Sequence, residues 1–528
     1  MMLQRPLAVM AAVAVVLMLP SLIWGTLPTN SSLHNLTWAA QFSDQVRAGI
    51  LYPRWLPDSF NGLGAPSFYF YPPLAFWADA LLRLVTFDAL STSWRLSLTS
   101  VVLLWASGGA MFAWLRLLGI ERRPALLGAI LYMAAPYHLL DHYFRGAFAE
   151  FAIYPVVPLV MAAIVLVAHR HRLGVAALAV AYALLILAHM PTALLVSLTA
   201  IPAYVLFLAR GGDTWFLPRC ALGFLLGLGL AAPYLLPALT LQPAVLIDWM
   251  WQWGFRVEQS FLLFPGRWVQ SPEAFVIIGS IAAGWLLASV SVLSQRLWAG
   301  IVIVSVLLMS GLVPWIWQLP MVSKVGFSWR LLAVVEFAAV TALCLAPWPR
   351  PRGPRLVLWL AVAAGAPALA LMANGIVGRI ELQTRGEVPP IQDAREYLPA
   401  GYPQHPNASY ADLNLELTKD VPLIACVPVP RRCQATPGAF GALSLSIESD
   451  QPTKVTVRRF AFPAWRLDPG LPVVASESQR LVSFDAPAGA GTYALDRRTL
   501  PVEQWGWSLA SGTLVLLILA GLLRPLRP

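Results

Sequence analysis

Residues 73–90, PLAFWADALLRLVTFDAL, decide how the chain is threaded through a bilayer. The segment is apolar enough to suggest a span, but it is short and carries Asp79, Arg83 and Asp88. A spanning helix needs about 20 mostly apolar residues. Asp79 and Arg83 are four residues apart, so they pair on one helix face. The segment therefore either crosses as a poor span or lies flat as an amphipathic helix.

Arginines at the ends of the other apolar runs decide between these alternatives, because cytoplasmic loops carry the excess of positive charge. If 73–90 lies flat, these arginines collect on one side, and if it crosses, most of the later ones face outward. We therefore predict that 73–90 lies in the outer interface, with both chain ends cytoplasmic. The arginines are Arg5, Arg116, Arg122, Arg123, Arg170, Arg172, Arg210, Arg219, Arg296, Arg350, Arg352, Arg355, Arg524 and Arg527.

The composition indicates a polytopic α-helical membrane protein. The chain is 58% hydrophobic and only 12% charged, and its mean hydropathy is +0.67. The net charge of +10 does not indicate nucleic acid, because the arginines sit at span ends. We expect the first run to be a retained helix, since no clear cleavage site follows it. The twelve expected spans are 6–27, 94–118, 124–137, 152–168, 173–189, 191–209, 219–240, 273–294, 297–318, 329–347, 355–373 and 505–523.

The predicted topology divides the chain into three parts. Residues 1–373 form the membrane domain with outer loop 28–93, residues 374–504 form an extracytoplasmic domain, and 505–528 form a last span and cytoplasmic tail. From about residue 441 the sequence alternates with a period of two, which predicts a β-sandwich-like domain. We expect residues 374–440 to be a long irregular cover.

The four cysteines divide by position. Cys426 and Cys433 lie in the polar segment CVPVPRRC, where an outer location favours a local disulfide. Cys220 and Cys344 lie in or beside apolar runs.

The outer loop begins PTNSSLHNLTWAAQFSDQVRAGILYPRWLPDSFNGLGAPSFYFYPP at residues 28–73. It is too polar to span, and its charges and aromatic residues predict a cover over a cavity. Arg54 lies between Pro53 and Trp55, and guanidinium matches phosphate geometry. The alternative is a loop anchored by aromatic residues at headgroup level. The candidate site residues of this loop are His34, Asp44, Arg54, Tyr69 and Tyr71.

A second polar loop, residues 138–151, has the sequence HLLDHYFRGAFAEF between two apolar runs. Ionisable residues at such a place are functional candidates. Its candidates are Asp141, His142, Arg145 and Glu150, and an internal Asp141–Arg145 pair is the structural alternative. His138 and His142 share a helix face, so they are also a candidate pair of metal ligands. The sequence offers no clear third ligand.

Two further candidates precede apolar runs. His189 precedes Pro191 at the outer end of a span, where it can also be a simple cap. Arg330 lies on the outer side, against the charge rule, which suggests an anionic partner. Glu336 is the alternative partner for Arg330.

Together these motifs resemble those of a known family. The ordered set HNLTWAAQF, GILYPRW, NGLGAPSFYFYPPL, APYHLLDHYFRGAFAEF, LAHMPTALL, GFSWRLLAV and FAFPAWRLDPG is similar to the bacterial membrane proteins termed 6-pyruvoyl-tetrahydropterin synthase-related. Nothing in the sequence resembles the zinc histidines of the soluble synthase. These proteins in turn resemble glycosyltransferases of the GT-C type.

The resemblance implies a location in the bacterial plasma (inner) membrane, an outer active site, an acidic base in the first loop and a polyprenyl-phosphate-linked sugar donor. Relatives carry an acid just before the first-loop histidine, where this chain has Asn30-Ser31-Ser32. The usual first-loop base is therefore either absent or shifted to Asp44 or Asp58, and Glu150 is the other candidate.

Two functions remain open from the sequence. The first is transfer of a sugar from the lipid-linked donor to an envelope glycan or lipid, with Asp44 or Glu150 as base and arginines on the phosphate. The second is a non-catalytic binder, transporter or assembly partner for lipid-linked glycans. Membrane lipid is an expected partner, nucleic acid is not, and a divalent cation is the one cofactor considered.

Overall fold

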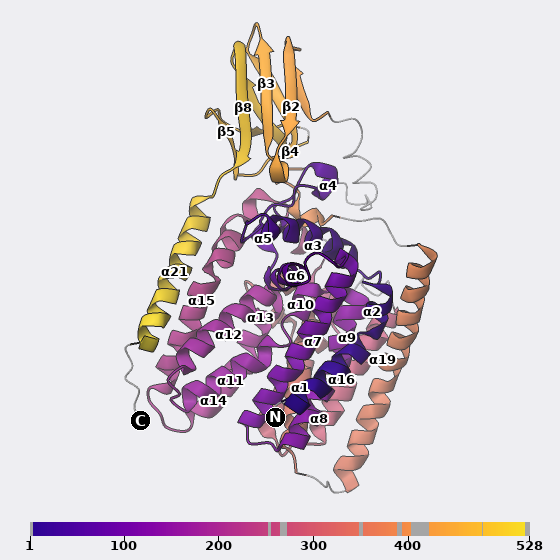
Figure 1. Ribbon diagram of the computed structural model, residues 1–528. Coiled ribbons are helices and arrows are strands. Elements are labelled where there is room, and N and C mark those ends of the chain that lie inside the picture. Colours follow the sequence, from indigo (N-terminus) through magenta and orange to yellow (C-terminus); the bar gives the residue numbers. More distant parts are fainter. Residues whose placement is uncertain are drawn as a thin grey trace.

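The structure is a computed structural model, and it describes residues 4–251, 255–263, 272–347, 352–387, 393–402, 422–477 and 479–522. A bundle of helices carries a β-sandwich at one end, here called the sandwich end (Figure 1). Both chain termini lie at the other end, here called the opposite end (Figure 1). The expected placement of both termini on one side is therefore seen in the bundle.

Eight helical segments of the described residues are long and apolar enough to cross a membrane. The fold class predicted from the sequence, a polytopic α-helical membrane protein, is confirmed. The segments are α7 (Thr92–Leu117), α10 (Phe148–Phe151) with α11 (Val156–Ala168), α13 (Met190–Leu198) with α14 (Ala200–Ala209), α15 (Phe216–Thr240), α16 (Pro272–Val290), η7 (Ser328–Leu331) with α18 (Leu332–Leu345), α19 (Arg352–Arg385) and α21 (Pro501–Leu522).

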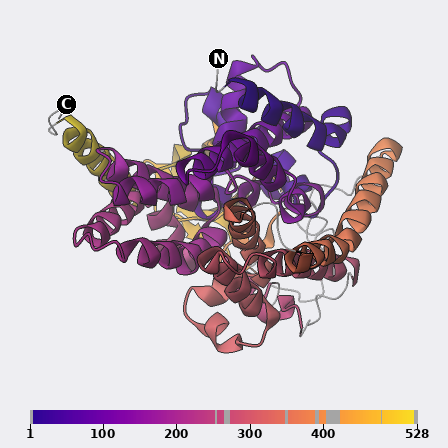
Figure 2. The ribbon, with the colours of Figure 1, turned by 90° about the horizontal axis from the view of Figure 1, so that it is seen from below.

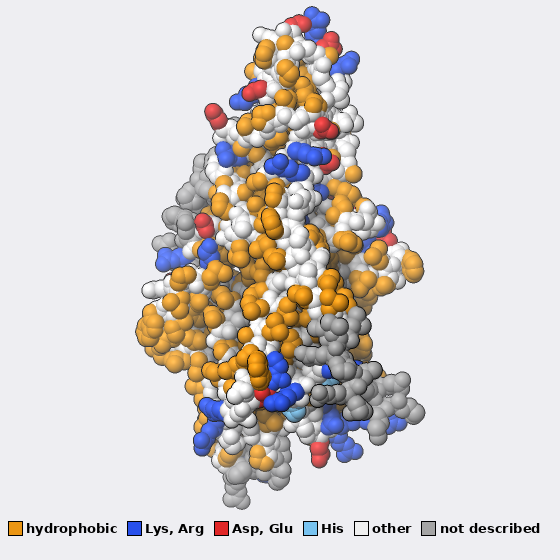
Figure 3. All heavy atoms as spheres, turned by 90° about the vertical axis from the view of Figure 1, so that its left-hand side faces the viewer, with side chains coloured by type: hydrophobic (Ala, Val, Ile, Leu, Met, Phe, Trp, Pro, Cys, Tyr) orange, Lys and Arg blue, Asp and Glu red, His pale blue; other side chains and the backbone are white. Residues whose placement is uncertain are grey.

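Shorter helices occupy the other four expected spans. They are α1 (Gln4–Leu17) with α2 (Leu19–Trp24), α8 (Arg122–Met133), α12 (Gly174–Ala188) and α17 (Arg296–Ser310). Figure 3 shows hydrophobic side chains predominating around the middle of one face, with charged side chains gathered toward its two ends. Helices α19 and α21 lie at opposite edges of the bundle (Figure 2).

The first loop folds into short helices that cover the sandwich end of the bundle (Figure 1). These are α3 (Ser32–Arg47), α4 (Ser59–Gly62), α5 (Ser67–Phe70) and α6 (Leu74–Val85). Helix α6 is seen nearly end-on in Figure 1 and so runs across the long helices. It leaves Leu81, Leu84 and Val85 exposed. An exposed apolar face on a helix across the bundle end agrees with the predicted interfacial position.

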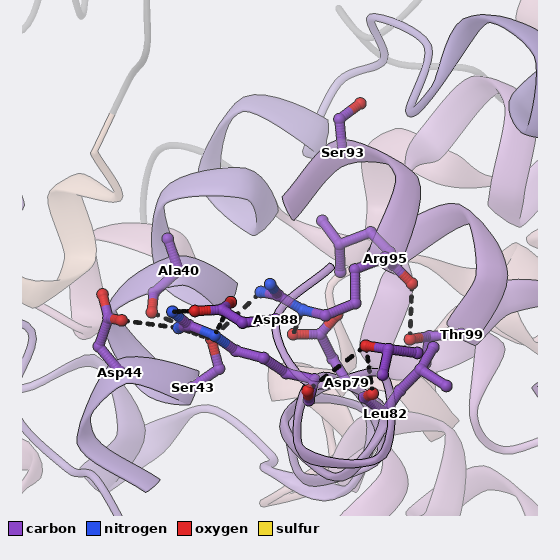
Figure 4. A network of polar contacts seen from close by, with 12 residues as sticks. Ala40, Ser43, Asp44, Asp79, Leu82, Asp88, Ser93, Arg95 and Thr99 are labelled. Atoms are coloured by element: carbon purple, nitrogen blue, oxygen red, sulfur yellow. Dashed lines mark hydrogen bonds and ion pairs between the residues drawn. The ribbon is translucent and has the colours of Figure 1, made fainter. Parts of the chain in front are cut away.

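Ion pairs hold α6 in this position (Figure 4). Arg83 pairs with Asp44 of α3 at 2.6 Å and with Asp88 at 2.7 Å. Arg95 of α7 pairs with Asp79 at 3.0 Å, and both side chains are buried. Burial raises the pKa of Asp79 to about 6, although Arg95 counteracts the shift. Asp79 is therefore ionised at neutral pH and can balance the buried guanidinium. The predicted Asp79–Arg83 helix pair is replaced by these longer-range pairs.

The C-terminal domain consists of two four-stranded antiparallel sheets, with strand orders β1-β4-β7-β6 and β2-β3-β8-β5. Its strands alternate buried and exposed residues, as in β3 and β4. Cys426 and Cys433 form a disulfide between β1 and β2. The strands are β1 (Ile424–Val427), β2 (Arg432–Pro437), β3 (Leu443–Ser449), β4 (Thr453–Phe460), β5 (Trp465–Asp468), β6 (Val474–Ala475), β7 (Leu481–Ala486) and β8 (Gly489–Arg497).

The boundaries of this domain differ from those predicted. Strands begin at Ile424 instead of about 441, because β1 and β2 are short and lack a long alternating run. Helix α19 continues to Arg385, past the expected end at 373, since residues 374–385 contain no proline to stop it. Residues 388–392 and 403–421 of the expected irregular cover lie outside the described residues, as does the tail from 523.

The sandwich is seated on the first loop. Trp55 packs edge-on against Trp465 at 5.1 Å, and Phe60 against Phe460 at 5.5 Å. The peptide N–H of Phe460 donates to the carbonyl of Leu63 at 2.9 Å. The first loop is therefore a layer between the membrane bundle and the C-terminal domain.

The predicted topology can be tested by labelling single cysteines in a chain with Cys220 and Cys344 replaced by Ser. We expect a membrane-impermeant maleimide to label Thr492→Cys of the sandwich in intact spheroplasts. Arg122→Cys and Arg172→Cys should react only after permeabilisation, because arginine-rich ends remain cytoplasmic. Reaction of all three positions from outside would contradict the flat placement of residues 73–90.

Asp79→Asn should destabilise the protein by about 3 kcal/mol, because it leaves the buried Arg95 without a balancing charge. Thermal unfolding in detergent measures this loss. Arg47→Gln is the matched control, since Arg47 pairs with Asp88 on the surface and its loss should change the melting temperature little. Equal melting temperatures for both variants would show that the buried pair does not hold α6.

Candidate active site

The site begins at a break between α9 (Pro136–Leu140) and α10. One turn of π-helix, η1 (Asp141–Arg145), ends at Gly146, whose φ is +60°. A Cβ at Gly146 would lie 2.0 Å from the Thr29 hydroxyl oxygen, so only glycine fits there. The peptide N–H groups of Asn30 and Ser31 donate to the carbonyls of Phe144 and Arg145. This break turns the 138–151 loop into the bundle.

Glu150 of α10 is the centre of the site, and only 1% of its surface is exposed. Its Oε1 accepts hydrogen bonds from the Tyr137 hydroxyl at 2.9 Å and the Thr192 hydroxyl at 3.2 Å. Its Oε2 lies 2.8 Å from Arg145 Nη1 and 3.3 Å from Arg330 Nε. Burying a charged carboxylate costs much free energy unless it has such hydrogen-bond and ion-pair partners.

Asp141 forms a second layer behind this carboxylate. Its Oδ1 lies 2.5 Å from Arg145 Nη1, and its Oδ2 accepts a hydrogen bond from the Tyr154 hydroxyl at 2.8 Å. Burial and the neighbouring Glu150 carboxylate raise the pKa of Asp141, whereas Arg145 lowers it. Arg145 therefore lies between two carboxylates, and the predicted Asp141–Arg145 pair is present alongside the Arg145–Glu150 pair.

His189 reaches Glu150 through Thr192. The Nδ1 atom of His189 lies 2.9 Å from the Thr192 hydroxyl oxygen, and that hydroxyl donates to Glu150. Because the hydroxyl has a single hydrogen, Nδ1 of His189 must be the donor in its pair with Thr192. Pro191 lies in the first turn of α13, where its missing N–H is tolerated, and sets the turn that brings these side chains together.

Arg330 comes from a third segment, η7, and its Nη1 also donates to the carbonyl of Val325. The guanidinium carbons of Arg330 and Arg145 lie 5.1 Å and 5.7 Å from the Phe327 ring centroid. Phe327 in turn stacks on Trp329 at 4.5 Å. Two cations and a stacked aromatic pair therefore lie on one side of Glu150. We call the set Tyr137, Asp141, Arg145, Glu150, His189, Thr192 and Arg330 the Glu150 cluster.

Glu336 is not the partner of Arg330, so that alternative was wrong. Its Oε1 accepts from the peptide N–H of Tyr137 at 2.7 Å and from the Trp285 indole at 3.1 Å. Its Oε2 accepts from the peptide N–H of His138 at 3.2 Å. Glu336 caps the start of α9, where a negative charge is favoured, and so fixes the helix that carries Tyr137.

The first loop brings Tyr71 near the cluster, and His34 lies near Tyr71's neighbour Trp38. Burial raises the pKa of Tyr71, while the charge of Arg330 lowers it and that of Glu150 raises it, so Tyr71 lies within their field. Tyr71 packs edge-on against Trp38 at 5.0 Å, and His34 lies 5.8 Å from the same ring. Tyr71 thus brings the first loop close to the Glu150 cluster.

Arg54 and Tyr69 belong to a different buried cluster. Arg54 Nε lies 2.7 Å from Glu503 of α21, and the Tyr69 hydroxyl donates to the same carboxylate at 3.4 Å. Arg54 also donates to the carbonyl of Pro233 at 2.6 Å. That carbonyl has no helical partner, because Pro237 four residues later lacks an N–H. The phosphate role proposed for Arg54 stays a prediction, but this arginine joins the first loop to α15 and α21.

Asp44 and Asp58 lie at the surface, outside the Glu150 cluster. The Asp44 side chain is 51% exposed and pairs with Arg83. Asp58 is exposed, and its peptide N–H donates to Gln41. Of the three carboxylates expected as the base, the structure therefore brings Glu150, but neither Asp44 nor Asp58, together with the other predicted site residues of the cluster.

His142 faces a small cavity beside the cluster. It lies 2.8 Å from the Ser21 hydroxyl, and burial lowers its pKa to about 4. The cavity, lined also by Asp141, Thr29 and Asn35, has a volume of about 30 Å³, enough for one water. Across the described residues, no group of three or more His, Cys, Asp or Glu side chains is arranged to hold a metal ion. The expectation of a divalent cation stays a prediction.

Sequence reasoning missed several partners in these clusters: Tyr137, Tyr154, Thr192, Phe327 and Glu503. Tyr137 directly precedes His138 in APYH, and Thr192 follows His189 by three residues in HMPT, which is the one local signal for them. Glu503 lies in the last helix, and nothing near it in the sequence points to Arg54.

These features define a multi-spanning membrane protein with a closed carboxylate–arginine site beneath its first loop. Residues 68–375, more than half of the chain, match the family described as 6-pyruvoyl-tetrahydropterin synthase related domain, membrane protein. The chain belongs to this family, which confirms the resemblance found in its motifs. All members of the Glu150 cluster fall within the matched residues.

Other comparisons are weaker. A crystal structure of ArnT from Cupriavidus metallidurans bound to undecaprenyl phosphate aligns at a TM-score of 0.43 and 13% identity, over 78% of this chain and 76% of that chain. Similarity at this level does not transfer an activity. No curated protein matches the chain.

Glu336→Leu should destabilise the protein by about 3 kcal/mol or more, because three buried N–H donors lose their acceptor at roughly 1–3 kcal/mol each. Glu336→Gln retains one acceptor oxygen and should cost less. The melting temperatures of the two variants, measured in the same detergent, report the difference. A leucine variant as stable as the wild type would contradict the capping role.

Proposed function

We propose that this protein transfers a sugar from a polyprenyl-phosphate-linked donor to a glycan or lipid of the bacterial cell envelope. The proposed reaction takes place at the sandwich end, on the periplasmic side of the inner membrane. The observation that carries the proposal is Glu150, buried between Arg145 and Arg330, which come from separate segments. Charged groups inside a membrane bundle are costly and are functional candidates by default.

The two arginines suit a lipid-linked phosphate. Their side chains are 14% and 13% exposed, whereas Glu150 is 1% exposed, so an incoming anion meets the guanidinium groups first. Guanidinium groups bind phosphate through paired N–H donors. Two of them also stabilise the negative charge that develops on a departing polyprenyl phosphate. Phe327 and Trp329 offer an aromatic face beside them for the sugar ring.

Donor binding would then release the carboxylate. A phosphate bound to Arg145 and Arg330 replaces Glu150 as their anionic partner, and Glu150 keeps Tyr137 and Thr192. The acceptor hydroxyl attacks the anomeric carbon, the bond from that carbon to the phosphate oxygen breaks, and the phosphate leaves with the electron pair. Glu150 takes the hydroxyl proton as general base. Attack opposite the leaving phosphate inverts the anomeric centre.

Glu150 is a better base candidate than Asp44 for a geometric reason. Asp44 pairs with Arg83 at the surface and contacts none of the phosphate-binding arginines proposed here. Glu150 also stands next to the His189–Thr192 pair, which can hold the carboxylate oriented while its arginine partners are occupied.

A non-catalytic binder of lipid-linked glycans is the second candidate. It is favoured by the saturation of Glu150, which accepts hydrogen bonds or ion pairs from Tyr137, Thr192, Arg145 and Arg330. A carboxylate with all four positions filled cannot accept a proton until some partners leave. The two candidates therefore differ in whether donor binding frees Glu150.

The Glu150→Gln variant distinguishes sugar transfer from non-catalytic binding. We expect it to abolish transfer, with a loss of about 10²–10⁴-fold as for other general bases. We also expect undecaprenyl phosphate to bind about tenfold more tightly, equivalent to about 1.4 kcal/mol, because the competing internal anion is gone. Binding is measured by titration of purified protein in nanodiscs, and transfer with radiolabelled polyprenyl-phosphate sugars.

Asp44→Asn serves as the matched control, because it removes a carboxylate from the other candidate position and should leave both readouts unchanged. Full transfer by Glu150→Gln, or its loss in Asp44→Asn, would contradict the assignment of the base. Tighter lipid binding by Glu150→Gln together with no transfer by the wild type would favour the binder.

A further inference from the structure

A large cavity lies where the C-terminal domain meets the bundle, apart from the Glu150 cluster. Its volume is about 950 Å³, near the upper end of the usual range of about 300–1,000 Å³ for ligand sites. Pro243 and Ala244, just after α15, line it from the bundle, together with Pro399 and Ala400 of the segment that pairs with Val245. Strands β5 and β6 and their connection line it from the sandwich. The cavity is therefore shared by the two domains.

The charge of the cavity is predominantly positive. Arg466, Arg480 and Arg498 line it together with a single carboxylate, Asp468. None of the three arginines has an ion pair among the described residues. The Nε of Arg480 is buried and has no hydrogen-bond partner in the described part of the chain. Such a donor indicates a missing acceptor, and a guanidinium prefers an anionic one.

Two further features of the wall suit a saccharide. Phe462 and Trp465 back the cavity, and they pack on Tyr69 and Trp55 of the first loop at 4.9 Å and 5.1 Å. Strands β5 and β6 are each the last strand of their sheet. An edge strand presents unpaired N–H and C=O groups, which can bind sugar hydroxyls.

We propose that this cavity binds an anionic glycan segment, one whose sugars carry carboxylate or phosphate groups. A lipid headgroup is the less suitable occupant, since Pro243, Ala244, Pro399 and Ala400 line the cavity on the bundle side and none of them belongs to one of the long apolar helices. A lone phosphate would fill only a small part of the volume. Binding itself is independent of sugar transfer, whereas identifying this glycan as the acceptor rests on the proposed function.

The test is titration of the full-length protein in nanodiscs of neutral lipid with tetragalacturonate, in the absence of any donor. Arg466→Gln/Arg498→Gln removes two exposed cavity arginines, and we expect it to weaken binding at least tenfold. Arg432→Gln/Lys454→Gln removes two exposed charges from other strands of the sandwich and should leave the affinity unchanged. Neutral maltotetraose should bind at least tenfold more weakly than tetragalacturonate to the wild type.

Each outcome decides the proposal. Loss of affinity in the cavity variant alone, with competition by inorganic phosphate, supports an anionic glycan site. No binding by the wild type, equal binding by the cavity variant, or equal binding of maltotetraose overturns it. Binding of anionic lipid vesicles that depends on Arg466 and Arg498, without tetragalacturonate binding, overturns it in favour of a lipid headgroup. Because no donor is present, failure here leaves the transfer activity of Glu150 to be judged separately.

Discussion

The structure depends on one buried carboxylate, Glu150, that pairs with two arginines. Arg145 and Arg330 are 185 residues apart in the sequence, and both pair with Glu150 inside an apolar bundle. Neither cation could be buried there alone, because an unpaired charge in such surroundings costs several kcal/mol. Glu150 therefore ties α10, η1 and η7 into one unit. An anion that competes for the same arginines would loosen that unit, and this couples ligand binding to the state of the carboxylate.

The first loop turns this buried site into a layered one. Tyr71, packed on Trp38, lies near the Glu150 cluster, while Trp55 and Phe60 pack against the sandwich. Arg54 joins the loop to the last helix through Glu503.

Much of this arrangement follows from the sequence. The arginine distribution predicts that residues 73–90 lie flat, and polar residues between apolar runs point to Arg145, Glu150, His189 and Arg330. The pairing of Arg54 could not be predicted, because Glu503 lies in a helix 449 residues away and a lone Pro-Arg-Trp motif suits a phosphate equally well. The capping role of Glu336 depends on peptide N–H groups, which carry no sequence signal. The early strands β1 and β2 were too short to show alternation.

The account requires a phosphate to take the place of Glu150 between the two arginines. The most direct measurement is a cryo-electron microscopy map of the full chain in nanodiscs with undecaprenyl phosphate. We predict phosphate density within hydrogen-bond distance of Arg145 and Arg330, with the Glu150 carboxylate turned away from both. Density elsewhere, such as beside Arg54, with Glu150 still paired to both arginines would contradict it.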